Sequence, residues 1–474
     1  MPRNVKRWGL AVGLLAVALL ASRYASAASV PALDGRSLGT IWCLPFAGFI
    51  LSIAVIPNFA PGFWQRHYSG VTLFWTLALL VPLGAAQGIA VAAVSVRDAV
   101  LLQYLPFIVL MFALFTISGG IRVTGALNGT PASNVCLLVL GLVLASVIGT
   151  AGAPVLLIRP LIRANAWRRH AAPVFVFFIF LVCNIGGALT PIGNPPLFLG
   201  FLAGVSFFWP LRHLFAPTLF VSGVLLALFF AIDSYAYRRE IVPIHPVAPG
   251  KLGIEGKRNL VLLLLAIAAV TGSGLWRPGI DLSIFGAEIG VQDMLRETLL
   301  IALALISLKI THSDTHQANG FSWTPMREVA ELFAGIFLTI MPAIAILRAG
   351  TAGALGPWIA LLNHPGGRPD DALYFWCAGL LSSALDNAPA YLMLFNAAGG
   401  DALALMGKLA TTLAAISAGA QFMGALTYIG NAPNFMVKSI CEERGVKMPS
   451  FLGYLAWSGA ILGPVYILVT VLFW

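Results

Sequence analysis

Long apolar segments, separated by short polar stretches, make up most of this chain. Runs of about 20 apolar residues suit a hydrocarbon layer about 30 Å thick, and such runs recur along the whole sequence. Continuous helices are predicted over six ranges: 40–59, 70–94, 100–121, 213–237, 328–347 and 450–474. With the broken and re-entrant segments described below, we predict an all-α polytopic membrane protein with about ten to twelve crossings.

Two of the apolar segments contain the same interruption. The sequence LTPIGNPPLF occupies residues 189–198, and LTYIGNAPNF occupies residues 426–435, 237 positions later. Each copy has a Gly-Asn step and one or two prolines, and proline removes a backbone donor and obstructs the preceding turn. Interrupted helices are therefore predicted over 172–208 and 409–437. Paired helix breaks in two halves of a transporter indicate its binding site.

Two further segments have the composition of hairpins that enter the membrane and return. The middle of the segment 133–158 reads GTAGAP, which supplies the small residues and the proline of a tight bend. A full crossing would place the basic residues that follow it outside, so the positive-inside rule favours a hairpin. The second hairpin is predicted over 372–398, with its tip at 386–389.

The order of these elements predicts two inverted repeats, each with a re-entrant hairpin and an interrupted transmembrane helix. The N-terminal repeat covers 40–237, the C-terminal repeat covers 328–474, and the linker 238–327 contains two connecting helices. Aligning Ala153-Pro154 with Ala388-Pro389 gives an offset of 235 for the hairpin tips. The first hairpin is predicted to open inward and the second outward. Inverted repeats of this kind underlie alternating access.

Composition and charge agree with this topology. The chain is 59% hydrophobic and 10% charged, whereas about 25% of the residues in a soluble domain are charged. Outside the first 27 residues, the predicted topology places 16 lysine and arginine residues inside and 8 outside, as the positive-inside rule requires. The topology therefore accounts for the net charge of +10, and no nucleic-acid partner is predicted.

Residues 1–27 have the pattern of a secretory signal peptide. A basic start with Arg3, Lys6 and Arg7 precedes an apolar stretch, and Ala25-Ser26-Ala27 is a small-residue cleavage site. An uncleaved first helix is the alternative. A cleaved signal indicates a bacterial envelope, so we expect a multi-pass protein of the inner membrane with both mature termini in the periplasm.

Cysteine and histidine spacing does not point to a bound metal. The five cysteines are scattered, and neither a CxxC pair nor a Cys/His ligand spacing occurs. His312 and His316 are four residues apart, but they belong to a polar loop. We therefore predict no cofactor and no resident metal, only a coupling ion, Na⁺ or H⁺.

The two hairpin tips and two helix breaks are expected to meet near the middle of the bilayer. Unwound carbonyls suit Na⁺, and helix N-terminal N–H groups suit anions. Hard cations prefer oxygen ligands from carbonyl, amide, hydroxyl and carboxylate groups. The candidate ion-binding or substrate-binding residues are Ser146, Thr150, Asn184, Thr190 and Asn194 in the first half and Ser382, Ser383, Asp386, Asn387, Thr427, Asn431 and Asn434 in the second.

Asp386 is the acid predicted to carry the chemistry. It lies in a run that is otherwise apolar or small, and an ionised carboxylate is costly inside a membrane. That cost suits it to exchange a bound proton for Na⁺. The alternative is a helix-capping aspartate, because Asp-Asn-Ala-Pro is also a good turn and N-cap sequence, and one residue can do both. Asp233, near the end of 213–237, is predicted to be interfacial.

The motifs at the interruptions resemble those of a known group of transporters. The runs SALDNAP (383–389), ALTPIGNPP (188–196) and ALTYIGNAPN (425–434) are similar to the ion-transporter superfamily, which includes citrate transporters, arsenite efflux pumps and NhaD-type sodium–proton antiporters. Over roughly residues 40–474, the chain looks most like a bacterial branch labelled citrate transporter or sodium:proton antiporter.

The resemblance implies two inverted repeats, re-entrant hairpins and, often, a homodimer. By position it assigns the hairpin-tip role to 150–154 and 386–389, and the helix-break role to 190–195 and 427–433. The chain departs from the pattern at the first tip, which lacks the acid usual in antiporter relatives. Neither tip carries the Ser-Asn-Thr of the dicarboxylate branch, so the resemblance alone leaves the substrate open.

Three functions are therefore compared. The leading hypothesis is secondary antiport of Na⁺, or another monovalent cation, against H⁺, with Asp386 carrying the exchange. The alternative is cation-coupled transport of citrate or a related di- or tricarboxylate, held by helix N-termini. A distant alternative is an intramembrane hydrolase that uses Asp386. Because HExxH and GxSxG motifs are absent from the sequence, we predict a transporter and not an enzyme.

Overall fold

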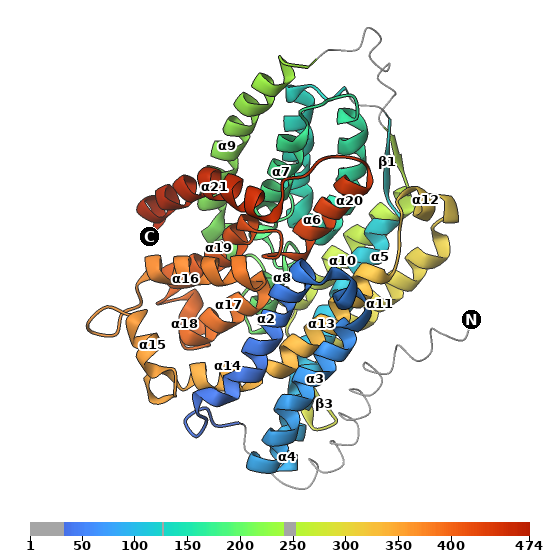
Figure 1. The fold of residues 1–474 in the computed structure, drawn as a ribbon. Helices are drawn as coiled ribbons and strands as arrows, with labels where there is room; N and C mark the ends of the chain where they lie inside the picture. The colour runs from blue at the N-terminus through green and yellow to red at the C-terminus, as the bar shows by residue number, and fades with distance from the viewer. Residues whose placement is uncertain (1–32, 126–127, 241–252) are drawn as a thin grey trace.

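The computed structural model describes residues 33–125, 128–240 and 253–474. The predicted signal peptide, 1–27, lies outside the described residues. Nearly all regular structure in the described part is helical (Figure 1), and the strands form two small antiparallel pairs, β1 with β2 and β3 with β4. The predicted all-α polytopic fold is confirmed.

The elements up to residue 240 include both parts of the first interruption. In chain order they are η2 (Thr40–Cys43), α2 (Leu44–Phe59), α3 (Pro61–Gln87), α4 (Ile89–Asp98), the π-helical η3 (Ala99–Tyr104), α5 (Leu105–Gly119), β1 (Arg122–Thr124), α6 (Pro131–Asn165), α7 (Ala172–Leu181), η4 (Ile185–Leu189), α8 (Pro195–Leu202) and α9 (Trp209–Tyr237).

The remaining elements include the second hairpin and the second interruption. They are β2 (Gly253–Glu255), α10 (Lys257–Leu275), β3 (Asp281–Ile284), β4 (Ala287–Gly290), α11 (Val291–Ile310), α12 (Ser313–Ala318), α13 (Thr324–Thr339), α14 (Met341–Arg348), η5 (Gly350–Ala352), α15 (Gly356–Leu361), α16 (Asp371–Ala384), α17 (Asn387–Ala397), α18 (Ala402–Met406), α19 (Ala410–Phe422), η6 (Met423–Leu426), α20 (Ala432–Glu443) and α21 (Phe451–Phe473).

Within the described residues, eight helices are long and apolar enough to cross a membrane, or nine if the bent pair α13 and α14 forms one span. Three predicted helices differ in detail. The helix predicted over 100–121 begins at Ile89, so Arg97 lies within it. The helix predicted over 70–94 ends at Gln87, because Gly88 has a φ of 92° and a glycine with positive φ ends a helix. The helix predicted over 328–347 bends by 42° between Thr339 and Met341, next to Pro342.

The first hairpin is present, and its two arms are the two helical parts of α6. Gly149, with φ 83° and ψ 156°, interrupts the helix near its middle. The ends of α6 meet: the Gly129 N–H donates to the Ala164 carbonyl over 3.0 Å, and Asn134 Nδ2 donates to Asn165 Oδ1 over 3.0 Å. A straight helix of 35 residues would hold its ends about 50 Å apart. The two ends of α6 therefore lie together, as in a hairpin.

The second hairpin consists of α16 and α17, with Asp386 at the bend between them. α16 packs against α19, and α17 packs against both α19 and α8. The second hairpin therefore lies against the broken helices of both halves.

The core lies around α7 and α19. α7 is apolar all round and entirely buried from Val174 to Leu181, as expected of a helix that other helices surround. In contrast, α2, α3, α10 and α21 expose many large apolar side chains on their outer faces. Such broad apolar surfaces suit contact with lipid.

Contacts group the charged loops into two sets at opposite ends of the molecule. At the end near β1 (Figure 1), Arg122 pairs with Glu255, and the backbone N–H groups of Arg169 and His170 donate to Glu240. At the end near α4 and β3, Arg97 donates to the Phe285 carbonyl. The first set consists of residues predicted to be inside, and the second of residues predicted to be outside.

Candidate functional site

The two helix breaks adopt the same backbone conformation. Each passes from a 3₁₀ turn into an extended threonine, with φ and ψ of −139° and 156° at Thr190 and −133° and 163° at Thr427. Each then reaches an extended asparagine, with −155° and 147° at Asn194 and −158° and 133° at Asn431. The prolines that follow occupy the first turn of the next helix, where a missing N–H costs nothing.

Each break is tied to a hairpin by its threonine. Thr190 Oγ1 donates to the Ser146 carbonyl over 2.5 Å, and Thr427 Oγ1 donates to the Ser383 carbonyl over 2.6 Å. Each hydroxyl also accepts a backbone N–H three residues ahead, from Gly193 or Gly430. These hydrogen bonds hold both breaks against their hairpins in the same way.

The equivalent hydrogen bonds give an offset of 237 for the hairpins as well as for the breaks. The predicted offset of 235, which aligns Ala153-Pro154 with Ala388-Pro389, is therefore wrong at the bends. Counted at 237, Gly149 is the equivalent of Asp386, and Thr150 is the equivalent of Asn387. Prolines near the two tips misled the alignment because proline fits several positions of the first helical turn.

Asp386 is the N-cap of α17, as one alternative expected, and it also faces a cavity. Its Oδ1 accepts the Ala388 N–H over 3.1 Å. The cavity beside it has a volume of about 100 Å³, enough for several water molecules. Gly149, Thr150, Asn194 and Asn431 line the same cavity. The cap and the predicted ion site therefore share one carboxylate.

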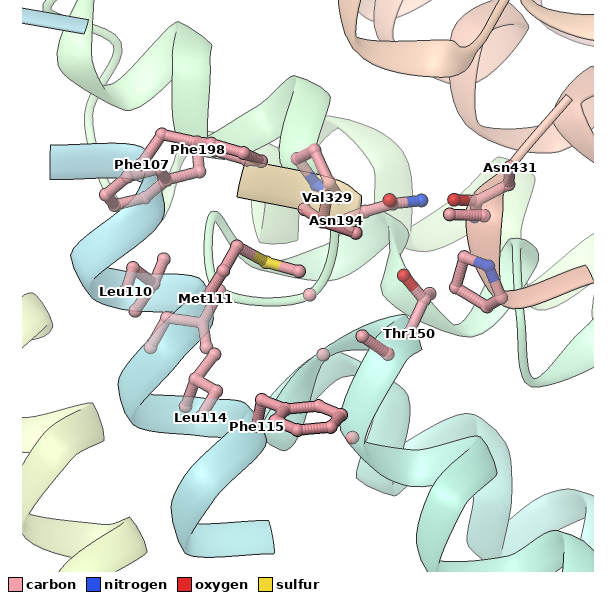
Figure 2. A pocket seen from close by; sticks show the side chains of 18 of the residues that line it. Phe107, Leu110, Met111, Leu114, Phe115, Thr150, Asn194, Phe198, Val329 and Asn431 are labelled. Carbon is pink, nitrogen blue, oxygen red and sulfur yellow. The ribbon is translucent and has the colours of Figure 1, made fainter. Parts of the chain in front are cut away.

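The two walls of the cavity differ in character (Figure 2). Thr150, Asn194 and Asn431 line it on one side. The opposite wall is apolar and consists mainly of α5, with Phe107, Leu110, Met111, Leu114 and Phe115, and with Phe198 beside Phe107. Val329 and Phe333 also line the cavity. Among the described residues that line the cavity, none is lysine, arginine or histidine.

A hydrogen-bonded cluster of amides lies behind Asn194, and we call it the first amide cluster. Its members are Asn194, Asn387 and Gln421. Asn387 Nδ2 donates to Asn194 Oδ1 over 3.0 Å, and Asn194 Nδ2 donates to Gln421 Oε1. The cluster joins the first break to both the second hairpin and α19.

Asn431 belongs to a second amide cluster, with Asn184 and Asn434. Asn431 Nδ2 donates to the Cys183 carbonyl over 2.7 Å and to Asn184 Oδ1 over 3.3 Å. Asn184 Nδ2 donates to Asn434 Oδ1 over 2.8 Å. Positions 184 and 421 also differ by 237, so the asparagine of each break is bonded to the equivalent position in the other half.

The candidate serines lie behind the cavity and support it. Ser146 Oγ donates to the Gly186 carbonyl over 2.5 Å, and Ser382 Oγ donates to the Ala420 carbonyl over 2.7 Å, each joining a hairpin to a broken helix. Ser383 Oγ bonds within its own helix to the Leu380 carbonyl. Of the candidates, the structure thus brings Thr150, Asn194, Asp386 and Asn431 together at the cavity, and the others lie outside its lining.

Sequence reasoning did not identify Gln421 or the apolar wall of α5. Gln421 lies in a run of small and apolar residues without a motif, although counting 237 back from it would have reached Asn184. The residues of the apolar wall look like any membrane helix in the sequence. Their position at the cavity follows from packing alone.

Asp233, which the sequence predicts to be interfacial, is part of a buried ion pair. Its side chain is fully buried and pairs with Arg168, also fully buried, over 2.6 Å. Asn134 Nδ2 donates to the second Asp233 oxygen over 3.0 Å. The partner lies 65 residues earlier, just after the first hairpin, so local sequence does not reveal it, and a buried acid needs such a partner.

No group of three or more possible metal ligands occurs among residues 33–125, 128–240 and 253–474. His316 stacks near Phe321 in the α12 region, with ring centroids 4.5 Å apart. Burial lowers the pKa of the His316 imidazole.

Comparison with protein-family models gives one match over nearly the whole chain. Residues 35–474 match the family described as putative citrate transport. No curated protein matches the chain. The match covers both hairpins, both breaks and the cavity, so the chain belongs to the putative citrate transport family.

Proposed function

We propose that this protein is a secondary transporter that exchanges a monovalent cation, Na⁺ in the first instance, for protons at Asp386. The observation that carries the proposal is the composition of the cavity. It holds one carboxylate among neutral amide, hydroxyl and carbonyl groups, and its described lining has no basic side chain. Such a lining supports a bound cation more than a bound polyanion.

The chemistry follows from the groups present. Hard cations bind carboxylate, amide, hydroxyl and carbonyl oxygens, and Asp386, Thr150, Asn194 and Asn431 offer the first three kinds around one space. A carboxylate in low-dielectric surroundings is stabilised either by a bound cation or by a proton. Competition between the two at Asp386 would couple cation movement to proton movement in the opposite direction.

Alternating access would arise from two inverted halves. Thr190 and Thr427 hold their hairpins alike, while the ends of α6 lie with the charged set near β1. The end of α17 instead contacts Arg348, whose Nε donates to Asn396 Oδ1 over 2.7 Å, and Arg348 lies with Asp34 and Asp98 around a surface pocket. These contacts support hairpins that open toward opposite ends. We place the protein in a bacterial inner membrane, with periplasmic termini and as a homodimer.

Cation-coupled transport of citrate, or of a related carboxylate, is the second candidate. It is favoured by the family match and by the N-termini of α8 and α20, whose Asn194 and Asn431 border the cavity. Helix N-termini attract anions. Two features weigh against a trivalent anion: the described lining has no basic side chain, and one wall of the cavity is apolar.

The decisive experiment is Asp386→Asn in everted vesicles. An asparagine oxygen still accepts the Ala388 N–H, so the helix cap persists while proton exchange is lost. Na⁺-driven proton movement should fall to background. Asp401→Asn is the matched control, because Asp401 Oδ1 caps α18 through the Leu403 N–H over 2.9 Å and is exposed. Unchanged movement in Asp386→Asn would refute the proposal.

Transport assays in proteoliposomes distinguish cation–proton antiport from citrate transport. Wild-type protein should move protons when Na⁺ is added without citrate, and labelled citrate should not accumulate. The carboxylate transporter would instead be established if citrate accumulated only with Na⁺ present and if no protons were exchanged when citrate was left out.

A further inference from the structure

The two amide clusters differ in how completely they are hydrogen-bonded. In the second cluster, Asn184 uses both its amide nitrogen and its oxygen, and Asn434 does the same. In the first cluster, Asn387 Oδ1 and Gln421 Nε2 are buried and have no partner among the described residues. Both residues are 0% exposed.

This difference is unexpected in two equivalent places of a repeated fold. Buried polar atoms are nearly always paired, because an unpaired one forgoes the hydrogen bonds that it had in water. Asn184 Nδ2 donates to the Ile179 carbonyl and to Asn434 Oδ1, and Asn434 Nδ2 donates to the Gly424 and Thr427 carbonyls. These bonds fix the second cluster. The first cluster has no such fixing bonds beyond the two that hold Asn194.

The first cluster is also the one connected to the carboxylate. Asn387 follows Asp386 directly, and its amide nitrogen holds Asn194 Oδ1 at 3.0 Å. Gln421 Oε1 accepts a hydrogen bond from the amide nitrogen of the same Asn194 side chain. The orientation of the Asn194 amide beside the cavity therefore depends on two side chains that retain unused hydrogen-bonding capacity.

We propose that the ligand is held at the first break, by Asn194 together with Asp386, and that Gln421 and Asn387 are positioning residues that set the Asn194 amide. The second cluster is then a rigid support of the fold. This inference rests on the proposed function only for the identity of the ligand, a monovalent cation. It assigns a role to Gln421, and it makes the two otherwise equivalent breaks unequal.

The test compares Gln421→Asn with Asn434→Ala and Gln65→Asn. Shortening Gln421 by one methylene withdraws its oxygen from Asn194, and loss of one hydrogen bond corresponds to a rise in KM for Na⁺ of roughly fivefold, with Vmax per folded molecule unchanged. Asn387→Ser should do the same. Asn434→Ala should lower Tm and the yield of folded protein but leave KM within about twofold. Gln65, exposed on α3, is the neutral control for the same exchange.

Binding measured without transport makes the outcome independent of the proposed antiport. NaCl, choline chloride and potassium citrate are compared for the rise in Tm that each gives, because a bound ligand stabilises by mass action. If citrate alone stabilises the wild type, antiport fails, yet the inference holds when that shift shrinks in Gln421→Asn and persists in Asn434→Ala. An unchanged KM and shift in Gln421→Asn overturns it. So does failure of both first-cluster variants to fold while Asn434→Ala folds.

Discussion

Gly149 and Asp386 occupy equivalent positions in the two halves of the chain. Each lies at the bend of a hairpin, three residues after the serine whose carbonyl accepts a hydrogen bond from the threonine of a break. Both line the same cavity. The cavity therefore has a carboxylate at one bend and bare backbone at the other.

The backbone explains why the first bend has no acid. Gly149 has a φ of 83°, and a Cβ added there would lie 3.2 Å from the Ile192 carbonyl oxygen. The φ of 171° at Asp386 is ordinary extended backbone that any residue adopts. A side chain is thus tolerated at the second bend and strained at the first.

Gly149→Ala should lower the free energy of unfolding by about 1–3 kcal/mol, the cost of placing a side chain in this region of φ and ψ. Thermal unfolding of purified protein in detergent measures the effect. Gly84→Ala is the control, because a Cβ at that helical position meets nothing within 4 Å. Equal Tm values for the two variants would show that the first bend is not strained.

Breaking the buried pair of Arg168 and Asp233 should be costly. Arg168→Met leaves an uncompensated buried carboxylate and should destabilise the protein by about 3–5 kcal/mol, whereas the double variant with Asp233→Leu should recover much of the loss. Arg122→Gln breaks an exposed pair with Glu255 and should cost at most about 1 kcal/mol. A double variant no better than the single one would contradict this account.

The two break threonines should contribute equally. Thr190→Val and Thr427→Val each remove a donor to a serine carbonyl and an acceptor for a glycine N–H, at a cost of about 1–3 kcal/mol. Both should also reduce transport, because the hairpins are no longer fixed to the breaks. Thr298→Val, which loses only an exposed bond to the Met294 carbonyl, serves as control. A large effect at one threonine alone would argue against equivalent breaks.

Glu240 should make stability depend on pH. Burial alone would raise the pKa of Glu240, but hydrogen bonds from the Arg169 and His170 N–H groups, with the charges of His170 and Arg168, lower it overall. A carboxyl whose pKa is lowered in the folded state stabilises that state at pH values above its ordinary pKa of about 4.3. This stabilisation is lost as the pH falls through the pKa of the folded state. The Tm difference between wild type and Glu240→Gln should therefore be largest near pH 7 and shrink below pH about 4.

A Tm difference that is constant over this range would assign Glu240 a purely steric role. Glu442→Gln provides the comparison, because Glu442 makes an exposed pair with Lys438 on the same helix. That variant should change Tm little at any pH.

Much of the fold could be predicted because its signals are local. The Gly-Asn-Pro run and the Gly-Asn-Ala-Pro run place both breaks within a few residues of where α8 and α20 begin, since proline and glycine affect the backbone of their own neighbours. The hairpin over 133–158 was predicted from its small residues and from the arginines after it. Lysine and arginine positions also predicted which loops would lie together.

The candidate site was predicted less completely, because it depends on contacts between distant residues. The amide of Asn184 meets Asn434 across 250 positions, and Asn194 meets Gln421 across 227. No local pattern distinguishes Gln421 from a polar residue on a helix surface, or the buried Asp233 from an interfacial one.

The sequence by itself determined a membrane-spanning helical chain, its two matching breaks and the acid at the second hairpin tip, because each depends on hydrophobicity or on the backbone of adjacent residues. Only the tertiary structure decided the alignment of Gly149 with Asp386, the apolar wall opposite the amides and the unequal pairing of the two clusters. The physical reason is that packing selects one set of partners for each buried polar group, and those partners lie far away along the chain.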